Sequence, residues 1–154
     1  MPLLTAWLFG PDASATLFTH PYSIEELSDR SETVVAGEVL ALRTEVRDGS
    51  PWTVASILVT ESLHGDSAPI VEAAWPGGRI GDIELVVAGS PSLVVGEDTV
   101  VFVAEAGRVV GLSQGVLHVE DGIAWRDLSH MGFVQDAPAG PEAYSIEEIR
   151  DLAR

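Results

Sequence analysis

The sequence predicts an all-β protein that carries one short helix before its sheet and another after it. Between residues 33 and 127, apolar and polar residues alternate with a period of two and β-branched residues are frequent, as in half-buried strands. The breaks between these runs contain Gly, Pro and Asp, which favour turns. No segment in this region has helical spacing long enough for a βαβ crossover. We therefore expect a mainly antiparallel sheet, closed as a barrel or folded as a sandwich.

Both predicted helices begin at a capping signature. In Ser23-Ile24-Glu25-Glu26 a Ser precedes a Glu by three residues, which predicts a helix that starts there and ends near Arg30. Ser145-Ile146-Glu147-Glu148 repeats the signature, and Ile149 and Leu152 continue an apolar stripe at three-residue spacing. A second short helix is therefore predicted to close the chain.

Eight strands are predicted from the alternating runs. They lie near residues 33–46, 52–62, 70–75, 83–87, 99–104, 109–112, 115–120 and 123–127. Asp121-Gly122 gives the clearest hairpin, because Asp-Gly between two alternating runs suits a two-residue type I′ turn. Residues 129–144 contain Pro138, Gly140 and Pro141 with little periodicity, and they are predicted to form a surface loop.

The composition limits the classes of partner. The chain of 154 residues has 8 Lys and Arg against 24 Asp and Glu, a net charge of −16, which repels phosphate backbones and anionic lipid headgroups. We therefore expect no nucleic-acid partner, and no membrane insertion because no segment approaches the roughly 20 apolar residues of a span. The absence of Cys excludes disulfides, thiol nucleophiles and zinc–thiolate sites. No cofactor is predicted.

Residues 1–15 are predicted to be an N-terminal arm or the remnant of a secretory signal. An apolar patch is followed by Ala13-Ser14-Ala15, which resembles a small-x-small cleavage site, although no Lys or Arg precedes the patch. Residues 16–154 are then a single β-barrel domain with a C-terminal helix.

The segment Gly111-Leu112-Ser113-Gln114-Gly115 fits the G-x-S-x-G pattern of a nucleophile elbow. The hypothesis it raises is a serine hydrolase with Ser113 as nucleophile, His130 or His118 as base, and Asp121 or Asp127 as the group that orients the base. An elbow needs a helix after the Ser, and residues 116–119 alternate as a strand. We therefore interpret the two glycines as a bend or bulge between strands and predict no catalytic residues.

Metal binding is not indicated by the spacing of the histidines. His20, His64, His118 and His130 lie far apart and show neither the H-x-x-x-H nor the H-E-x-x-H pattern. No D-x-D-x-D-G loop is present for calcium.

A binding surface is predicted at the segment that follows the third strand. Its residues are Trp75, Gly77, Gly78, Arg79, Gly81 and Asp82. The glycines indicate an exposed connection, and an Arg near a Trp is a pair enriched in protein interfaces. The alternative is a core Trp and a surface Arg paired with carboxylates. Trp52 and Trp125 also fall on or beside strands, where a Trp either stacks on a ligand or fills the core.

The segment of residues 32–66 resembles the opening hairpin of netrin-like modules and tissue inhibitors of metalloproteinases. It contains ETVVAGEVLALRTEV, a turn, and WTVASILVTESLHGD, where those families have a short helix, a V-x-G-x-V strand and a second strand ending in a similar turn. The runs GGRIGDIELVVAGSPSLVVGEDTVVFV and GRVVGLSQGVLHV are also similar to uncharacterised secreted bacterial proteins. The resemblance implies an OB-like antiparallel barrel. It implies no inhibitory residue, because the inhibitors chelate zinc through an N-terminal Cys that this chain lacks.

The sequence thus predicts a secreted or periplasmic, non-enzymatic protein-binding module, inhibitor-like in fold, that uses loops and an open strand edge. The charge favours a basic partner and salt-sensitive association. Two alternatives stay open, the serine hydrolase and a structural subunit of an extracellular assembly that self-associates through a sheet edge.

Overall fold

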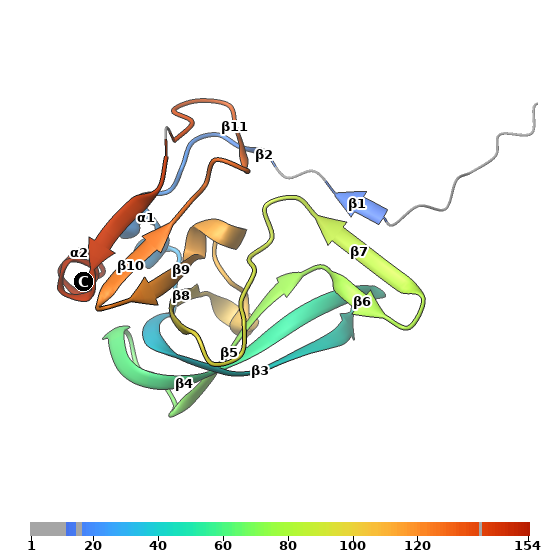
Figure 1. Ribbon diagram of the computed structural model, residues 1–154, viewed down its shortest axis with the longest axis horizontal. Helices are drawn as coiled ribbons and strands as arrows, with labels where there is room; N and C mark the ends of the chain where they lie inside the picture. Colours follow the sequence, from blue (N-terminus) through green and yellow to red (C-terminus); the bar gives the residue numbers. More distant parts are fainter. Residues whose placement is uncertain (1–11, 15–16, 139) are drawn as a thin grey trace, which may run out of the picture.

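The protein is β-rich and is built around one seven-stranded antiparallel sheet (Figure 1). The computed structural model describes residues 12–14, 17–138 and 140–154. In spatial order the strands are β12 (Glu142–Ser145), β10 (Ile123–Arg126), β9 (Val116–Glu120), β8 (Asp98–Val103), β3 (Thr33–Arg47), β4 (Ser50–His64) and β5 (Ile70–Pro76). The predicted β-rich fold with an antiparallel sheet is confirmed.

Two smaller sheets accompany the main one. One contains β6 (Gly78–Ile80), β7 (Ile83–Val87) and β1 (Asp12–Ser14), with β1 parallel to β7. The other pairs β2 (Leu17–Phe18) with β11 (Gly132–Phe133). In Figure 1, β6 and β7 lie on the side of the molecule away from α2 (Ile146–Leu152).

Each short helix begins at its predicted Ser. Helix α1 (Ile24–Asp29) starts after Ser23, whose hydroxyl accepts from the Glu26 backbone N–H, and α2 starts after Ser145 with both hydrogen bonds of a capping box. The helices pack on each other, where the Ser28 hydroxyl donates to the Ala153 carbonyl at 2.8 Å. Both helix predictions are confirmed.

Strand β8 and the first half of β3, residues 33–39, are buried on both faces, which explains their near-continuous runs of apolar residues. One hydrophobic cluster contains Val34 and Phe102 and is covered by the two helices. The other contains Val35 and Val101 and is covered by side chains of β4 and β5. Alternate residues of one strand therefore belong to different clusters, as the period of two requires.

Two tight hairpins have Asp-Gly turns, and one of them is the predicted turn at Asp121-Gly122. Asp121 and Gly122 both have positive φ, 51° and 76°, and they join β9 to β10 as a two-residue loop. Asp48 and Gly49 do the same between β3 and β4. This is the type I′ geometry, which matches the twist of the flanking strands.

The predicted strand at 109–112 is wrong. Residues 108 and 109 form only isolated bridges, Ala74 with Arg108 in parallel and Val103 with Val109 in antiparallel. The chain then turns, because Leu112 has a φ of 56° and opens the 3₁₀ turn η2 (Leu112–Gly115). A second 3₁₀ turn, η1 (Glu105–Gly107), follows β8.

The predicted loop at 129–144 is wrong in part, since it contains β11 and the edge strand β12. The sequence of β12 is too short to alternate visibly, and its extended shape depends on pairing with β10. Of the predicted arm at residues 1–15, only the backbone of β1 lies within the described residues. Among the helices described here, none has the length and apolar character needed to cross a membrane.

Candidate functional site

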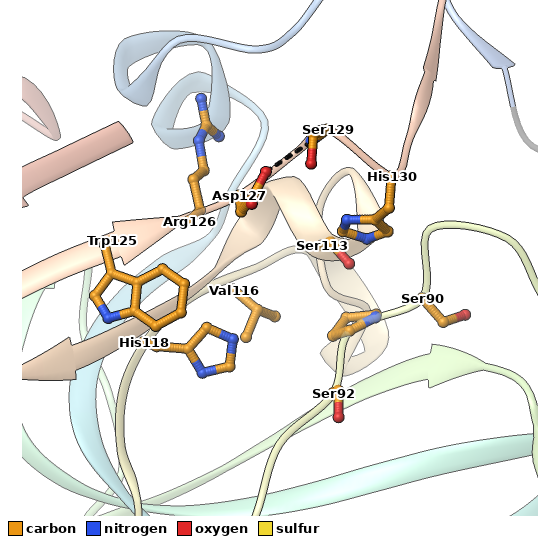
Figure 2. Close-up of a pocket in the computed structure, with 11 residues that line it drawn as sticks. Ser90, Ser92, Ser113, Val116, His118, Trp125, Arg126, Asp127, Ser129 and His130 are labelled. Carbon is orange, nitrogen blue, oxygen red and sulfur yellow. Dashed lines mark hydrogen bonds between the residues drawn. The ribbon is translucent and has the colours of Figure 1, made fainter. Parts of the chain in front are cut away.

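Three separate segments line one cleft beside β9 and β10 (Figure 2). The first is the connection after β7, the second is η2 with the start of β9, and the third is the end of β10 with the turn that follows. The cleft has a volume of about 360 Å³, and its lining residues are Ser90, Pro91, Ser92, Ser113, Val116, His118, Trp125, Arg126, Asp127, Ser129 and His130. Hydroxyl, imidazole and carboxylate groups thus meet beside one indole ring.

The side chains of His118 and Trp125 lie next to each other on one side of the cleft (Figure 2). They are directly opposed in the β9–β10 register, and their ring centroids are 5.1 Å apart. Nδ1 of His118 lies 2.9 Å from a carboxylate oxygen of Glu97. The other oxygen of Glu97 accepts from the Val94 backbone N–H at 2.6 Å. Glu97 therefore fixes the imidazole to the loop that precedes β8.

Asp127 and His130 lie at the end of the cleft that follows β10. The Asp127 carboxylate accepts from the Ser129 backbone N–H at 2.9 Å. Hydrogen bonding from Ser129, first by its hydroxyl and then by its backbone, lowers the pKa of Asp127 below its usual value, with a smaller contribution from His130. Asp127 is thus an ionised acceptor at neutral pH.

Ser113 lies across the cleft from Trp125 in Figure 2 and lines the same cleft as His130. Its hydroxyl donates to the Gly89 backbone carbonyl at 2.7 Å, and its backbone N–H donates to the same oxygen at 3.0 Å. The residue that follows η2 is the first of strand β9, so no helix stands behind the Ser. The chain here does not form a nucleophile elbow, which requires a strand–turn–helix.

The fold explains why both outer positions of the G-x-S-x-G segment are glycines. Gly111 has a φ of 68°, and an added Cβ would come within 3.1 Å of the Tyr22 ring. Gly115 has ordinary dihedrals, but its Cβ would lie 2.1 Å from the Val110 carbonyl oxygen. The interpretation as a bend with close backbone approach is confirmed for Gly115, whereas the atoms nearest to Gly111 belong to the side chains of Tyr22 and Gln114.

Of the residues proposed for the hydrolase, the cleft contains Ser113, His118, Asp127 and His130. Asp121 is absent from its lining, in the β9–β10 turn. Among the described residues, no hydrogen bond joins Ser113 to either His, and none joins Asp127 to His130. The groups are near one another without the hydrogen-bonded chain that activates a serine.

The predicted binding segment forms the β6–β7 hairpin and its connection to β5. Trp75 is 4% exposed and belongs to the second hydrophobic cluster. Arg79 is exposed and donates from Nε to the carbonyl of Gly81 at 3.2 Å. Gly77 and Gly78 both have positive φ, and Gly81 and Asp82 form the exposed hairpin turn. The hairpin contains four of the six predicted residues, Gly78, Arg79, Gly81 and Asp82, while Gly77 is buried in the connection to β5 and the Trp faces the core.

Part of the cleft could be predicted from the sequence. A two-residue turn at Asp121-Gly122 places His118 opposite Trp125, because residues 120 and 123 then pair. No comparable signal exists for Ser92 or Glu97, which come from a connection without periodicity. Within the described residues, no group of three or more His, Cys, Asp or Glu side chains is arranged to hold a metal ion.

No protein-family model, curated protein or solved structure matches this chain.

Proposed function

We propose that this chain is a non-enzymatic, secreted or periplasmic module that binds another protein through the outer edge of β7. One observation carries the proposal: this edge already accepts a separate strand. β1 pairs in parallel with β7, with Asp12 opposite Leu85 and Ser14 opposite Val87. Ile83 and Glu84 have no partner strand on that edge among the described residues. A strand from a partner can extend or replace β1 by backbone hydrogen bonding.

The side chains of β7 and its turn suggest the chemistry of the partner. Ile83 and Val86 are 63% and 47% exposed, and Asp82 and Glu84 are exposed carboxylates beside them. Glu84 and Val86 share one face of β7 and Ile83 lies on the other, so an added strand with apolar side chains on both faces and a basic side chain near Glu84 would complement this edge. The net charge of −16 would also speed its approach and make binding sensitive to salt.

The scaffold we propose is an OB-like barrel, similar to the netrin-like modules. Two isolated bridges support it, because residues 108 and 109 contact both β5 and β8. With these contacts the strands would form a closed barrel in the order β8, β3, β4, β5 and the 108–109 segment, which returns to β8. The pairing of Ala74 with Arg108 would be the parallel one in that barrel. A location outside the cytoplasm rests on the resemblance of residues 1–15 to the end of a secretory signal. Cleavage at that site would remove β1 and leave the β7 edge open to the strand of a partner.

Salt-dependent capture with charge-reversed variants tests this function. Immobilised protein is incubated with native culture fluid at low salt and then washed with about 0.5 M salt, which shortens the Debye length to a few Å. We expect a partner that is released by salt and lost in Glu84→Lys. Glu120→Lys makes the same charge change at an exposed position on β9 and should keep the partner. Equal capture by both variants, or no salt-released protein, contradicts the proposal.

Self-association through the same edge is distinguished by light scattering at increasing concentration. A mass that rises with concentration for wild type and not for Glu84→Lys would favour the structural-subunit alternative instead. We expect a constant mass.

The serine hydrolase remains the second candidate because Ser113, Asp127 and His130 line one cleft. The hydrogen bond from the Ser113 hydroxyl to the Gly89 carbonyl supports the non-enzymatic proposal over it. A hydroxyl proton given to a backbone carbonyl is not in position for transfer to an imidazole.

A further inference from the structure

The cleft beside β9 and β10 has a wall that suits stacking. The Trp125 side chain is 39% exposed, although it lies on a strand of the main sheet. Its ring is inclined by 35° to the His118 ring, so the neighbouring imidazole does not lie flat against the indole. The negative face of an aromatic ring attracts the weakly positive C–H groups of a ligand. The cleft is at the small end of the roughly 300–1,000 Å³ typical of small-molecule sites, which suits a single ring.

Hydrogen-bonding groups surround this wall and are not all used within the protein. Among the described residues, the side chains of Ser92 and His130 form no hydrogen bond. Because the Glu97 carboxylate accepts only, neutral His118 must donate from Nδ1, which leaves Nε2 as an acceptor. Asp127 adds an ionised carboxylate. The cleft therefore offers both donors and acceptors around the indole.

The positive charge that lines the cleft is paired, because the Arg126 guanidinium binds the Glu142 carboxylate. The Glu97 carboxylate accepts a hydrogen bond from neutral His118. An anionic ligand would be repelled by Asp127 and by a protein of charge −16. An uncharged ligand with several hydroxyl groups avoids this repulsion and can use both the donors and the acceptors of the cleft.

We propose that this cleft binds one pyranose ring of a neutral carbohydrate. The C–H face of the sugar stacks on Trp125, and its hydroxyls hydrogen-bond with Asp127, His130 and Ser92. This site is separate from the β7 edge, so it does not depend on the proposed protein partner. The residues that line the cleft do not include the β6–β7 hairpin, so a variant in one site should leave the other intact.

Saturation-transfer NMR and calorimetry with simple glycosides test the proposal. The probes are the methyl pyranosides of glucose, galactose, mannose and N-acetylglucosamine, with glucuronate as a charged comparison. We expect at least one neutral glycoside to bind with a Kd of about 0.1–10 mM, as one small polar ligand allows. Trp125→Ala and Asp127→Asn should each weaken that binding about tenfold or more.

Ile123→Ala is the matched control, because Ile123 is similarly exposed two residues away on β10 and does not line the cleft. Its affinity should stay within about twofold of wild type. If Trp125→Ala fails to fold, Trp125→Phe, which retains a ring, should bind more weakly than wild type, and Asp127→Asn, at a half-buried position, decides the outcome. The proposal is overturned if no neutral glycoside binds, if glucuronate binds best, or if Asp127→Asn binds as wild type does.

Discussion

The Arg126 guanidinium and the Glu142 carboxylate form an ion pair across β10 and β12, with 2.8 Å between Nε and Oε2. The Arg126 side chain is 2% exposed, and it also donates to the backbone carbonyls of Gln114 and Tyr22. The Gln114 side chain completes the network by accepting from the Tyr22 backbone N–H. One cation therefore joins the segment before α1, the turn η2 and the edge strand β12.

Arg126→Met should destabilise the protein by about 3–5 kcal/mol, because it removes the guanidinium donors of this network and leaves Glu142 and two carbonyls without their partner. Urea unfolding at neutral pH measures the loss. Arg154→Met is the control, since its ion pair with Asp151 is 79% exposed on the Arg side and should contribute less than about 1 kcal/mol. If the two variants were equally stable, the network would not hold these segments together.

Gly115→Ala should cost about 3 kcal/mol, because the new Cβ would overlap the Val110 carbonyl, a backbone atom that cannot rotate away. The dihedrals of Gly115 are ordinary, so the cost is steric alone. Gly140→Ala has open space around its Cβ and should change the free energy of unfolding by less than about 0.5 kcal/mol. Equal stability of these two alanine variants would mean that η2 can shift to make room.

The sequence was sufficient to predict those helix starts and turns that depend on a few neighbouring residues. The caps at Ser23 and Ser145 and the turn at Asp121-Gly122 satisfy backbone groups within the same segment, so the sequence could predict them. In contrast, β12 has only four residues, and β10 determines its extended form. The predicted strand at 109–112 failed because Gly111 and Leu112 both adopt positive φ, and a Leu gives no sign of that.

The cleft could be predicted only in part for the same reason. His118, Asp127 and His130 stood out as chemical groups, and the hairpin register placed Trp125 beside the first of them. These residues share a cleft with Ser113 only because of the position of η2. Hydrogen bonds to Arg126 and Gly89, from other parts of the chain, hold η2 there. Long-range hydrogen bonds of this kind leave no periodic trace in a sequence.

Ser113 should not react with a fluorophosphonate probe, because its hydroxyl proton is held by the Gly89 carbonyl and no imidazole accepts it. Gel-based labelling of wild type beside Ser113→Ala makes the comparison. The substitution should also cost about 1 kcal/mol through the lost hydrogen bond. Labelling of wild type that Ser113→Ala abolishes would establish the hydrolase instead.

Asp127 should titrate below an ordinary aspartate, and Ser129 should be the main cause. The pKa of Asp127 is lowered first by the Ser129 hydroxyl, then by the Ser129 backbone N–H, and least by His130. A carboxylate with a lowered pKa stabilises the fold above its unfolded-state pKa, and this contribution is lost as the pH falls through the folded-state pKa.

Carbon-13 NMR of the Asp127 carboxyl group measures that pKa directly. Ser129→Ala should raise the pKa toward its usual value, while the remaining backbone hydrogen bond keeps part of the shift. His130→Ala should raise it less, because the imidazole acts only through its charge. A larger rise in His130→Ala than in Ser129→Ala would show that Asp127 and His130 form the coupled pair a hydrolase needs, and would reopen the catalytic hypothesis for this cleft.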